Sequence, residues 1–392
     1  MNNQTQAIHL PYVRRDAFDA LSMPVYNAVA YEFDDAQTMS DAFCNRIDAP
    51  DYGRCENPTT RYFEERVKAL THAPMVTALN SGMAAISNTL MALASQGKNV
   101  VTSRHLFGNT YSLLTRTLAR FGVETRLVDL TRPEAVEAEV DGNTCCIFLE
   151  ILTNPQLEVA DLRALARIAH AHSIPLVADT TTIPFIKFSA HALGVDIEVV
   201  SSTKYISGGA TSLGGLIIDY GTTPVYADKI KNEMIFNLGA YMGPQVSFMQ
   251  TTGLETLDAR YRVQSANALE LARRLRRLPE VKHGNYGGRE ENPYHALAKA
   301  QFGDTAGAMV CIDLESKEAC FRFINHLRLV HRATNHHDNR TLAIHPSSTI
   351  FGLFSEEEKR DMDILDTTIR LSVGLEHVDD IFADIAQALE AR

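Results

Sequence analysis

The chain has 392 residues, more than one small hydrophobic core holds, so we expect two or three domains. Apolar residues make up 45% of it and charged residues 22%, which excludes disorder for most of the chain. The net charge of −11 argues against nucleic acid and anionic membranes as partners, because binding to phosphate groups needs a cationic face.

The N-terminal residues have no basic start followed by an apolar block, so we expect no secretory signal. No apolar run approaches the roughly 18 residues of a membrane span. None of the cysteines forms a CxxC pair, so we expect reduced thiols that pack as small core residues in a cytoplasmic protein. These cysteines are Cys44, Cys55, Cys145, Cys146, Cys311 and Cys320.

Residues 1–60 lack strong periodicity and contain the turn-rich stretch DAPDYGRCENPTTR, so we expect an extended arm. From residue 61 onward, helical patterns alternate with short apolar runs. The predicted helices cover 61–70, 82–96 after an N-cap at Ser81, 109–120 and 161–172. The predicted strands cover 99–103, 125–130, 144–151, 174–180, 197–202 and 213–219.

Short apolar strands that alternate with helices are typical of βαβ units around a buried, mostly parallel sheet. A long helical stretch at 253–278 then leads to a region that mixes strands (307–315, 367–374) with helices (317–330, 377–391). We therefore expect three parts: the arm 1–60, a large domain 61–252, and a smaller C-terminal domain 253–392 that includes the linking helix.

Two nucleotide motifs and one metal motif find little support. No GxGxxG follows the first predicted strand, and Gly215 stands where a P-loop needs lysine. His336, His337 and His345 cluster, but their spacing fits no common zinc pattern. We expect these histidines at the surface or in backbone contacts, and no metal site.

Three other features are more informative. Ser81-Gly82-Met83 opens a helix, where free N–H groups favour a phosphate. Lys204 lies between an apolar strand and a glycine-rich turn, and a desolvated lysine amine is suited to a Schiff base. Asp179 ends a predicted core strand, where a carboxylate needs a cationic partner or several donors. Each feature alone is weak, because Ser is a routine N-cap and most lysines are solvated.

Taken together and in order, these residues resemble the Cys/Met-metabolism family of enzymes that depend on pyridoxal 5'-phosphate (PLP). The resemblance runs from about Tyr52 to the C-terminal helix. It implies the α/β fold type I of aspartate aminotransferase, with a mostly parallel sheet in the large domain and a smaller α+β C-terminal domain. It also implies an obligate dimer, commonly a pair of dimers, that shares its sites between subunits.

By position, the resemblance implies that Lys204 forms the Schiff base and that Asp179 pairs with the pyridinium nitrogen. Asn154, in LTNPQ, matches an asparagine near the ring oxygen of the cofactor, and Phe107 matches the residue stacked on the ring. The residues implied at the phosphate are Ser81, Gly82, Met83, Ser201 and Thr203.

Further positions concern the substrate and the neighbouring subunit. Tyr52 and Arg54, in DYGRCENPT, match a Tyr-x-Arg motif that reaches the neighbour's phosphate. Arg370, in TTIRLSVG, matches the arginine that forks onto the substrate carboxylate. Taken singly, either arginine reads as an ordinary surface residue. Asn335 begins the stretch NHHDNRTLAIHPSST, which is similar to the O-acetylhomoserine sulfhydrylases, whereas γ-lyases typically have Ser there.

The chain also departs from the family pattern. Phe107 replaces a tyrosine and keeps the stacking contact without a proton to donate, so acid–base work must pass to Lys204, Tyr52, water or the substrate. His336-His337 replaces a common Leu-Gly. The reaction that we expect is γ-replacement on an O-acylated homoserine with sulfide or a thiol, giving homocysteine or methionine. The alternatives are γ-elimination, as in methionine γ-lyase or cystathionine lyase, and an inactive PLP-binding regulatory or scaffold protein.

Overall fold

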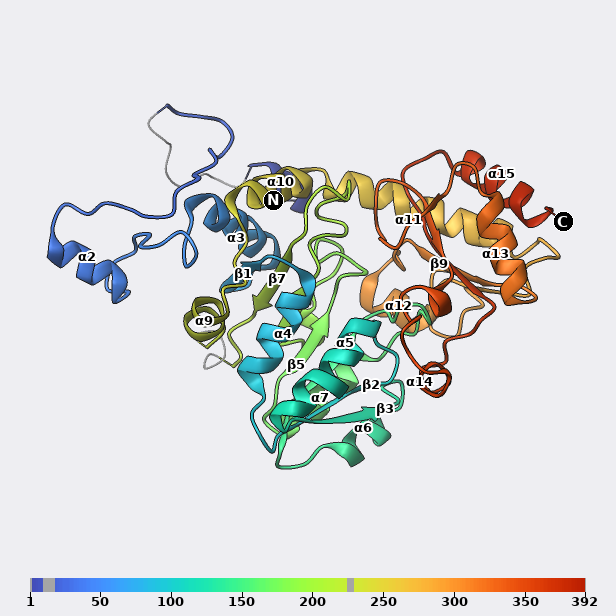
Figure 1. Cartoon of the computed structure of the whole chain (residues 1–392), viewed down its shortest axis with the longest axis horizontal. Coiled ribbons are helices and arrows are strands. Elements are labelled where there is room, and N and C mark those ends of the chain that lie inside the picture. The colour runs from blue at the N-terminus through green and yellow to red at the C-terminus, as the bar shows by residue number, and fades with distance from the viewer. Residues whose placement is uncertain (1, 10–17, 224–228, 392) are drawn as a thin grey trace.

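The computed structural model describes residues 2–9, 18–223 and 229–391. In this part of the chain, seven strands form one sheet in the order β1-β7-β6-β5-β4-β2-β3, and only β7 runs against the others (Figure 1). Its strands are β1 (Met75–Leu79), β2 (Asn99–Ser103), β3 (Glu124–Val128), β4 (Thr144–Glu150), β5 (Leu176–Asp179), β6 (Ile197–Val200) and β7 (Gly215–Asp219).

Helices cover both faces of this sheet, and the strand sequences show why. Every residue of β4 is buried, with Ile147 and Leu149 in the hydrophobic core on one face and Cys146 and Phe148 in the core on the other. The first core holds α3 (Pro58–Thr71), α7 (Leu162–Ala171) and α10 (Pro244–Glu255). The second core holds α4 (Gly82–Leu93). The mostly parallel α/β fold is therefore confirmed.

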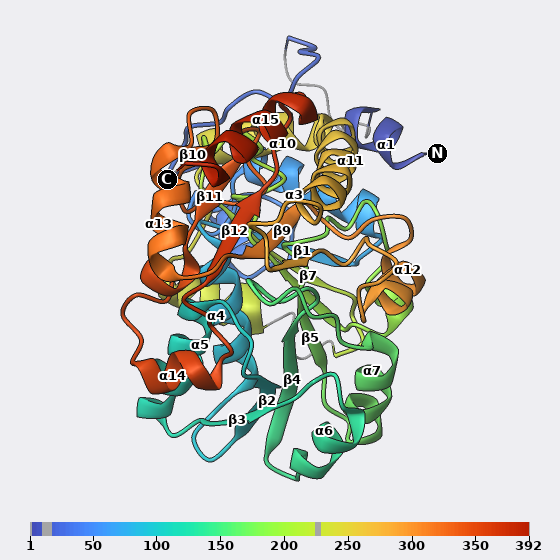
Figure 2. The ribbon, with the colours of Figure 1, turned by 90° about the vertical axis from the view of Figure 1, so that its right-hand side faces the viewer.

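A second, five-stranded sheet follows in the described chain, in the order β10-β11-β12-β9-β8. It has mostly antiparallel pairs and lies above one edge of the larger sheet (Figure 2). Its strands are β8 (His283–Asn285), β9 (Met309–Asp313), β10 (His331–Arg332), β11 (Leu342–Ile344) and β12 (Thr368–Ser372). The helices α11 (Leu257–Leu275), α13 (Lys317–His326) and α15 (Val378–Leu389) share the hydrophobic core of this sheet. Residues of α12 (His295–Phe302) belong to the first core of the larger sheet, and α14 (Glu356–Asp361) follows β11 in the chain. The domain boundaries after residues 60 and 252 stay a prediction.

Several local predictions were wrong. The first 60 residues are not purely extended, since they contain α1 (Asn3–His9) and α2 (Ala36–Phe43), which projects from the body (Figure 1). Strand β1 was missed. The helix expected over 109–120 is three short pieces, namely α5 (Gly108–Ser112), a π-helical turn and a 3₁₀ turn. The long helix expected over 253–278 breaks at Thr256, between α10 and α11.

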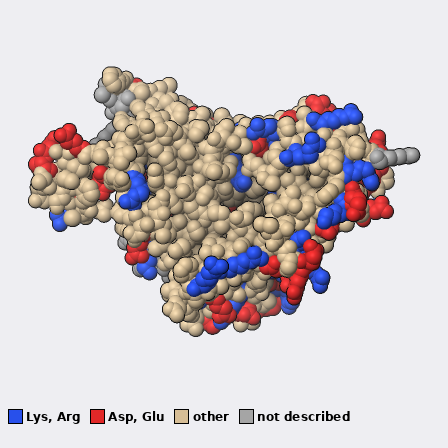
Figure 3. All heavy atoms as spheres, viewed as in Figure 1, with Lys and Arg blue, Asp and Glu red and all other residues tan. Residues whose placement is uncertain are grey.

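Two further short helices are α6 (Pro133–Glu139) and α9 (Phe236–Leu238). Among the cysteines, the core prediction holds for four, but Cys44 is exposed and Cys55 is half-buried. Both wrong cases lie in the N-terminal arm, which has no core of its own in the single chain. Within the described residues, no helix is long and apolar enough to cross a membrane. Figure 3 shows charges of both signs interspersed over one face of the molecule, with acidic side chains gathered near α2.

Candidate active site

A cavity of about 550 Å³ lies where the carboxyl ends of the parallel strands meet the start of α4 and the smaller sheet. Ligands of open α/β sheets bind at this edge. The cavity brings together most of the residues that the sequence predicted. These are Ser81, Gly82, Met83, Phe107, Asn154, Asp179, Ser201, Thr203, Lys204, Asn335 and Arg370.

Lys204 follows β6 and points its amine into the cavity. Its Nζ donates to Asn335 Oδ1 at 2.8 Å. Burial and the charge of Arg370 lower the pKa of Lys204 to about 8, although Asp179 and Asp338 oppose this shift. A substantial fraction of the amine is therefore neutral near physiological pH, which is the form that attacks an aldehyde.

Asp179 ends β5, and its Oδ1 accepts a hydrogen bond from the Thr181 N–H at 2.9 Å. Burial raises the pKa of Asp179, while Thr181 and Lys204 work against the increase. A protonated ring nitrogen beside this carboxylate would give it a cationic partner.

Glu150 is a cavity residue that sequence reasoning missed. It ends β4 and pairs in register with Asp179 on β5. Its Oε1 accepts from the Phe107 N–H at 2.6 Å, which fixes the backbone of the predicted stacking residue. Burial, and then the charge of Asp179, raises the pKa of Glu150 well above its usual range. A carboxylate at the end of an apolar strand, the feature that singled out Asp179, would also have found Glu150.

The start of α4 is built for an anion. Ser81 is its N-cap and accepts from the Ala84 N–H at 3.1 Å, so the N–H groups of Gly82 and Met83 have no partner within the helix. A Cβ at Gly82 would lie 2.5 Å from the Ser201 Cβ, so glycine is needed for Ser201 to approach. The Thr203 hydroxyl donates to the Gly214 carbonyl at 3.2 Å and accepts from the Gly214 N–H at 3.0 Å.

Arg370 on β12 carries a fully buried guanidinium into the cavity. Its Nη1 donates to Asn154 Oδ1 at 3.1 Å, and its Nη2 donates to the backbone carbonyls of Thr334 and Asn335. Burial lowers the pKa of Arg370 to about 10, so the group remains cationic. Its Nε has no hydrogen-bond partner among the described residues. A substrate carboxylate would provide that missing acceptor.

The surface prediction for the three histidines was wrong, because all are buried. His336 lines the cavity, and its Nδ1 lies 2.9 Å from Nδ1 of His337. His337 stacks on Tyr205, with ring centroids 3.9 Å apart. His345 lies elsewhere and does make a backbone contact, with Nε2 2.8 Å from the Asp366 carbonyl oxygen. Spacing could not predict the burial of His336 and His337, because it depends on the loop after Thr334, whose carbonyls contact Arg370 on a distant strand.

Tyr52 and Arg54 lie outside this cavity. Tyr52 is 40% exposed, and the Arg54 guanidinium lies 5.5 Å from the centre of its ring. Arg54 also donates to the Phe236 carbonyl. Among the described residues, neither lines the cavity that holds the predicted cofactor set, so their predicted roles require a neighbouring subunit.

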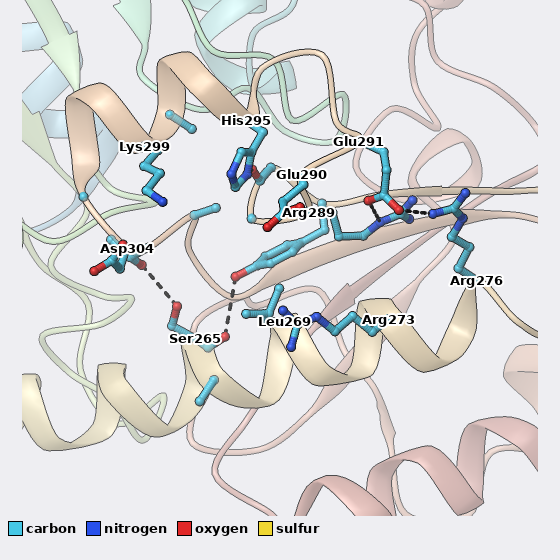
Figure 4. A pocket seen from close by; sticks show the side chains of 18 of the residues that line it. Ser265, Leu269, Arg273, Arg276, Arg289, Glu290, Glu291, His295, Lys299 and Asp304 are labelled. Carbon is cyan, nitrogen blue, oxygen red and sulfur yellow. Dashed lines mark hydrogen bonds and ion pairs between the residues drawn. The ribbon is translucent and has the colours of Figure 1, made fainter.

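A second cavity, of about 860 Å³, lies between α11, α12 and the loop after β8 (Figure 4). It holds many charged side chains, including Arg273 and Lys299, and Glu291 pairs with Arg276 and Arg289. It contains none of the predicted site residues, so the chemistry belongs to the first cavity.

The first cavity fits PLP, the cofactor that the resemblance implies. The free N–H groups of Gly82 and Met83 and the Ser201 hydroxyl suit its phosphate. Asp179 suits its ring nitrogen, and Lys204 suits its aldehyde. The donor set thus matches the three polar ends of this cofactor.

Comparisons with known proteins agree with this geometry. The Cys/Met metabolism PLP-dependent enzyme family matches residues 4–390. The L-methionine gamma-lyase of Fusobacterium nucleatum subsp. nucleatum is 36% identical over 390 residues, which cover 98% of this chain and 97% of the relative.

Two crystal structures are also similar. One, described as an O-acetylhomoserine (thiol)-lyase from Campylobacter jejuni, contains a pyridoxyl-lysine phosphate; it has a TM-score of 0.96 and 32% identity, with all of both chains covered. The O-acetylhomoserine sulfhydrylase of Wolinella succinogenes has a TM-score of 0.77 and 44% identity, covering 85% of this chain and 96% of its own. The chain is therefore a PLP-dependent enzyme that acts on small amino-acid substrates, and it belongs to the Cys/Met metabolism family.

Proposed function

We propose that the enzyme catalyses γ-replacement on an O-acylated homoserine, such as O-acetylhomoserine, with sulfide or a thiol as the incoming group. The observation that carries this proposal is the 2.8 Å hydrogen bond between Lys204 Nζ and Asn335 Oδ1. It puts Asn335, the position where γ-lyases typically have Ser, beside the reactive amine. The 44% identity with the sulfhydrylase of Wolinella succinogenes supports the same choice.

The protein's contribution is binding, orientation and proton transfer. When bound, PLP acts as an electron sink for negative charge at the substrate Cα. Arg370 binds the substrate carboxylate through its unpartnered Nε–H, and Asp179 holds a proton on the ring nitrogen. Lys204 would take the Cα proton and assist removal of a Cβ proton before the leaving group departs, and both carbons would regain a proton after sulfur bonds to Cγ. Phe107 lines the cavity and would pack on the ring of the cofactor and exclude water.

The overall exchange balances without an oxidant or reductant. The Cγ–O bond breaks, and its electron pair leaves with the acyl group as a carboxylate. The sulfur nucleophile forms a new bond to Cγ, and its proton is lost to the carboxylate or to solvent. The products are a carboxylic acid and homocysteine or its thioether, methionine when the thiol is methanethiol.

The site is proposed to be completed by a second copy of the chain. Tyr52 and Arg54 would reach the phosphate in the neighbouring subunit from the arm of residues 1–60. Tyr52 carries a phenol that could assist proton transfer there. The assembly would be a dimer or a pair of dimers.

The rival reaction is γ-elimination, which gives an oxo-acid, ammonia and a thiol. The 36% identity with a methionine gamma-lyase favours it. The absence of a phenol at Phe107 disfavours it, because a thiolate leaving group needs a proton.

A product assay separates the two reactions. The purified holoenzyme is given O-acetylhomoserine with sulfide, and separately methionine alone, and homocysteine, oxo-acid and ammonia are quantified. We expect homocysteine from the first mixture and little oxo-acid from the second. Lys204→Ala should abolish turnover and the borohydride-sensitive absorption band. Oxo-acid as the main product of both mixtures would contradict the proposal.

A further inference from the structure

His336 lines the cavity that also holds Lys204 and Arg370. It follows Asn335, whose backbone carbonyl accepts from Arg370 Nη2 at 3.2 Å, and it lines the same cavity as Lys204 and Phe107. Its side chain is buried but reaches the cavity, with 9% of the residue exposed. A substrate anchored by Arg370 and Lys204 therefore lies against this imidazole.

The partner of His336 fixes which ring nitrogen carries its proton. Nδ1 of His336 and Nδ1 of His337 lie 2.9 Å apart, so one donates and the other accepts. His337 is fully buried, and its Nε2 has no hydrogen-bond partner among the described residues. A proton on that Nε2 would be a buried donor without an acceptor, which proteins rarely tolerate. The favoured state has His337 donating from Nδ1.

This tautomer leaves His336 accepting at Nδ1 and carrying its own proton on Nε2, the ring nitrogen that does not contact His337. Stacking against Tyr205, with an interplanar angle of 9°, holds the plane of His337 and so keeps the donor aligned. Among the described residues, the contact with His337 at Nδ1 is the hydrogen bond that the His336 ring makes, and His336 lines the cavity. The imidazole therefore presents a free N–H group.

His336 is also held uncharged. Burial, followed by the positive charges of Lys204 and Arg370, lowers the pKa of His336 well below its ordinary value. A neutral imidazole N–H is a hydrogen-bond donor and a poor proton donor. It pairs well with a carbonyl or carboxylate oxygen and poorly with a thioether sulfur, which is a weak acceptor.

We propose that His336 is a specificity-determining residue whose Nε2–H donates to the acyl oxygen of the substrate and selects O-acyl esters over thioethers. This inference rests on the proposed function. As the Cγ–O bond breaks, its electron pair moves onto the departing carboxylate, and the hydrogen bond strengthens with the growing negative charge. No proton passes from His336.

Three substitutions at one position test the proposal. His336→Gln keeps an N–H near the position of Nε2. His336→Asn keeps a polar group near Nδ1, beside His337, but loses the donor in the cavity. His336→Leu removes both. His331→Gln, at an exposed position on β10, is the matched control.

The first measurement is kcat/KM for O-acetylhomoserine with sulfide, in otherwise wild-type enzyme that carries each substitution. The second is the Kd of O-acetylhomoserine and of methionine, measured by calorimetry on PLP-loaded Lys204→Ala protein that carries the same substitutions. We expect the Asn and Leu variants to lose at least about tenfold in kcat/KM and about threefold in ester affinity. Methionine affinity should stay within about twofold, and the Gln variant and the control should resemble the parent.

Equal ester affinities for the Asn and Gln variants would overturn the inference, as would a parallel loss of methionine binding. Failure of the proposed function gives a different result, in which the wild-type enzyme makes no homocysteine. The Kd comparison uses Lys204→Ala protein, which cannot catalyse the reaction. It therefore tests the role of His336 even if the wild-type enzyme makes no homocysteine.

Discussion

Single residues in this site take their chemistry from their surroundings. Lys204 has a pKa near 8 because its amine is buried close to Arg370, and Arg370 is itself buried with an unpartnered Nε. Both groups are set up to be neutralised by ligands, Lys204 by an aldehyde and Arg370 by a carboxylate. Burying these two cations is unfavourable in the free protein, so ligands that neutralise them bind selectively.

Phe107→Tyr tests the residue that departs most clearly from the family pattern. A phenol at this position could donate a proton to a departing thiolate, which phenylalanine cannot do. We therefore expect γ-elimination from methionine to increase by at least about tenfold, as general acid catalysis typically contributes more than that. Production of oxo-acid from methionine measures it.

The matched control is Phe107→Leu, which removes the aromatic ring without adding a hydroxyl. It should not increase elimination. An unchanged rate of elimination in Phe107→Tyr would show that the phenol is not the missing proton donor.

At the scale of elements, the loops after β2 and β4 are tied to the segment after α14 by one imidazole. His105 follows β2, and its Nδ1 contacts Glu158 Oε2 while its Nε2 lies 2.8 Å from Asp363 Oδ2. Burial opposes the charge of this imidazole, but the hydrogen bonds to the two carboxylates outweigh it and raise the pKa of His105. This bridge lies two residues from Phe107, so it braces one wall of the cavity.

His105→Gln should make the stability of the protein less dependent on pH. A raised pKa in the folded state means that the charged imidazole contributes its stability fully below its unfolded pKa of about 6.5. That contribution is lost as pH rises through the folded pKa. We expect the variant to lose about 1–2 kcal/mol at pH 6 and less at pH 9, measured by urea unfolding.

His283→Gln, at an exposed position on β8, serves as the control and should cost little at either pH. A loss in His105→Gln that is the same at pH 6 and pH 9 would mean that the bridge does not depend on the imidazolium charge.

At the scale of the whole molecule, the site joins two sheets. Asp179 and Lys204 come from the larger sheet, whereas Arg370 comes from the smaller one. The segment around α2 projects from the body of the single chain, and Tyr52 and Arg54 lie outside the cavity (Figure 1). These features agree with an arm that is packed against a second subunit.

Mixing two defective chains tests this arrangement. Lys204→Ala removes the amine of a site, and Arg54→Ala removes the cation that the arm is proposed to deliver to the neighbour's site. Each homo-oligomer should be nearly inactive, but a randomly mixed dimer population should recover roughly a quarter of wild-type activity, because each mixed dimer holds one intact site. Recovery is measured as homocysteine formation after subunit exchange.

Full activity of Arg54→Ala alone, or no recovery on mixing, would contradict a shared site. A mixture of Lys204→Ala with Asp179→Asn is the matched control. If both residues serve the same chain's site, each mixed dimer has two defective sites and no activity should return.

Much of this protein was determined by the sequence itself. Apolar strands such as 144–151, alternating with helices, required a buried parallel sheet, and that sheet placed Asp179 and Lys204 at one edge. Local capping at Ser81 likewise fixed the start of α4. These features depend on periodicity and neighbouring residues, which a sequence displays directly.

Other features were decided by the tertiary structure. Whether a polar side chain is buried depends on what packs over it. The sequence therefore predicted His336 and His337 at the surface, whereas both are buried in the loop whose Thr334 carbonyl accepts a hydrogen bond from Arg370. The placement of Glu150 beside Asp179 follows from the pairing of β4 with β5, which are separate in the chain. Burial and the pKa shifts that it causes are properties of the assembled fold, because they arise from the exclusion of water by residues far apart in the chain.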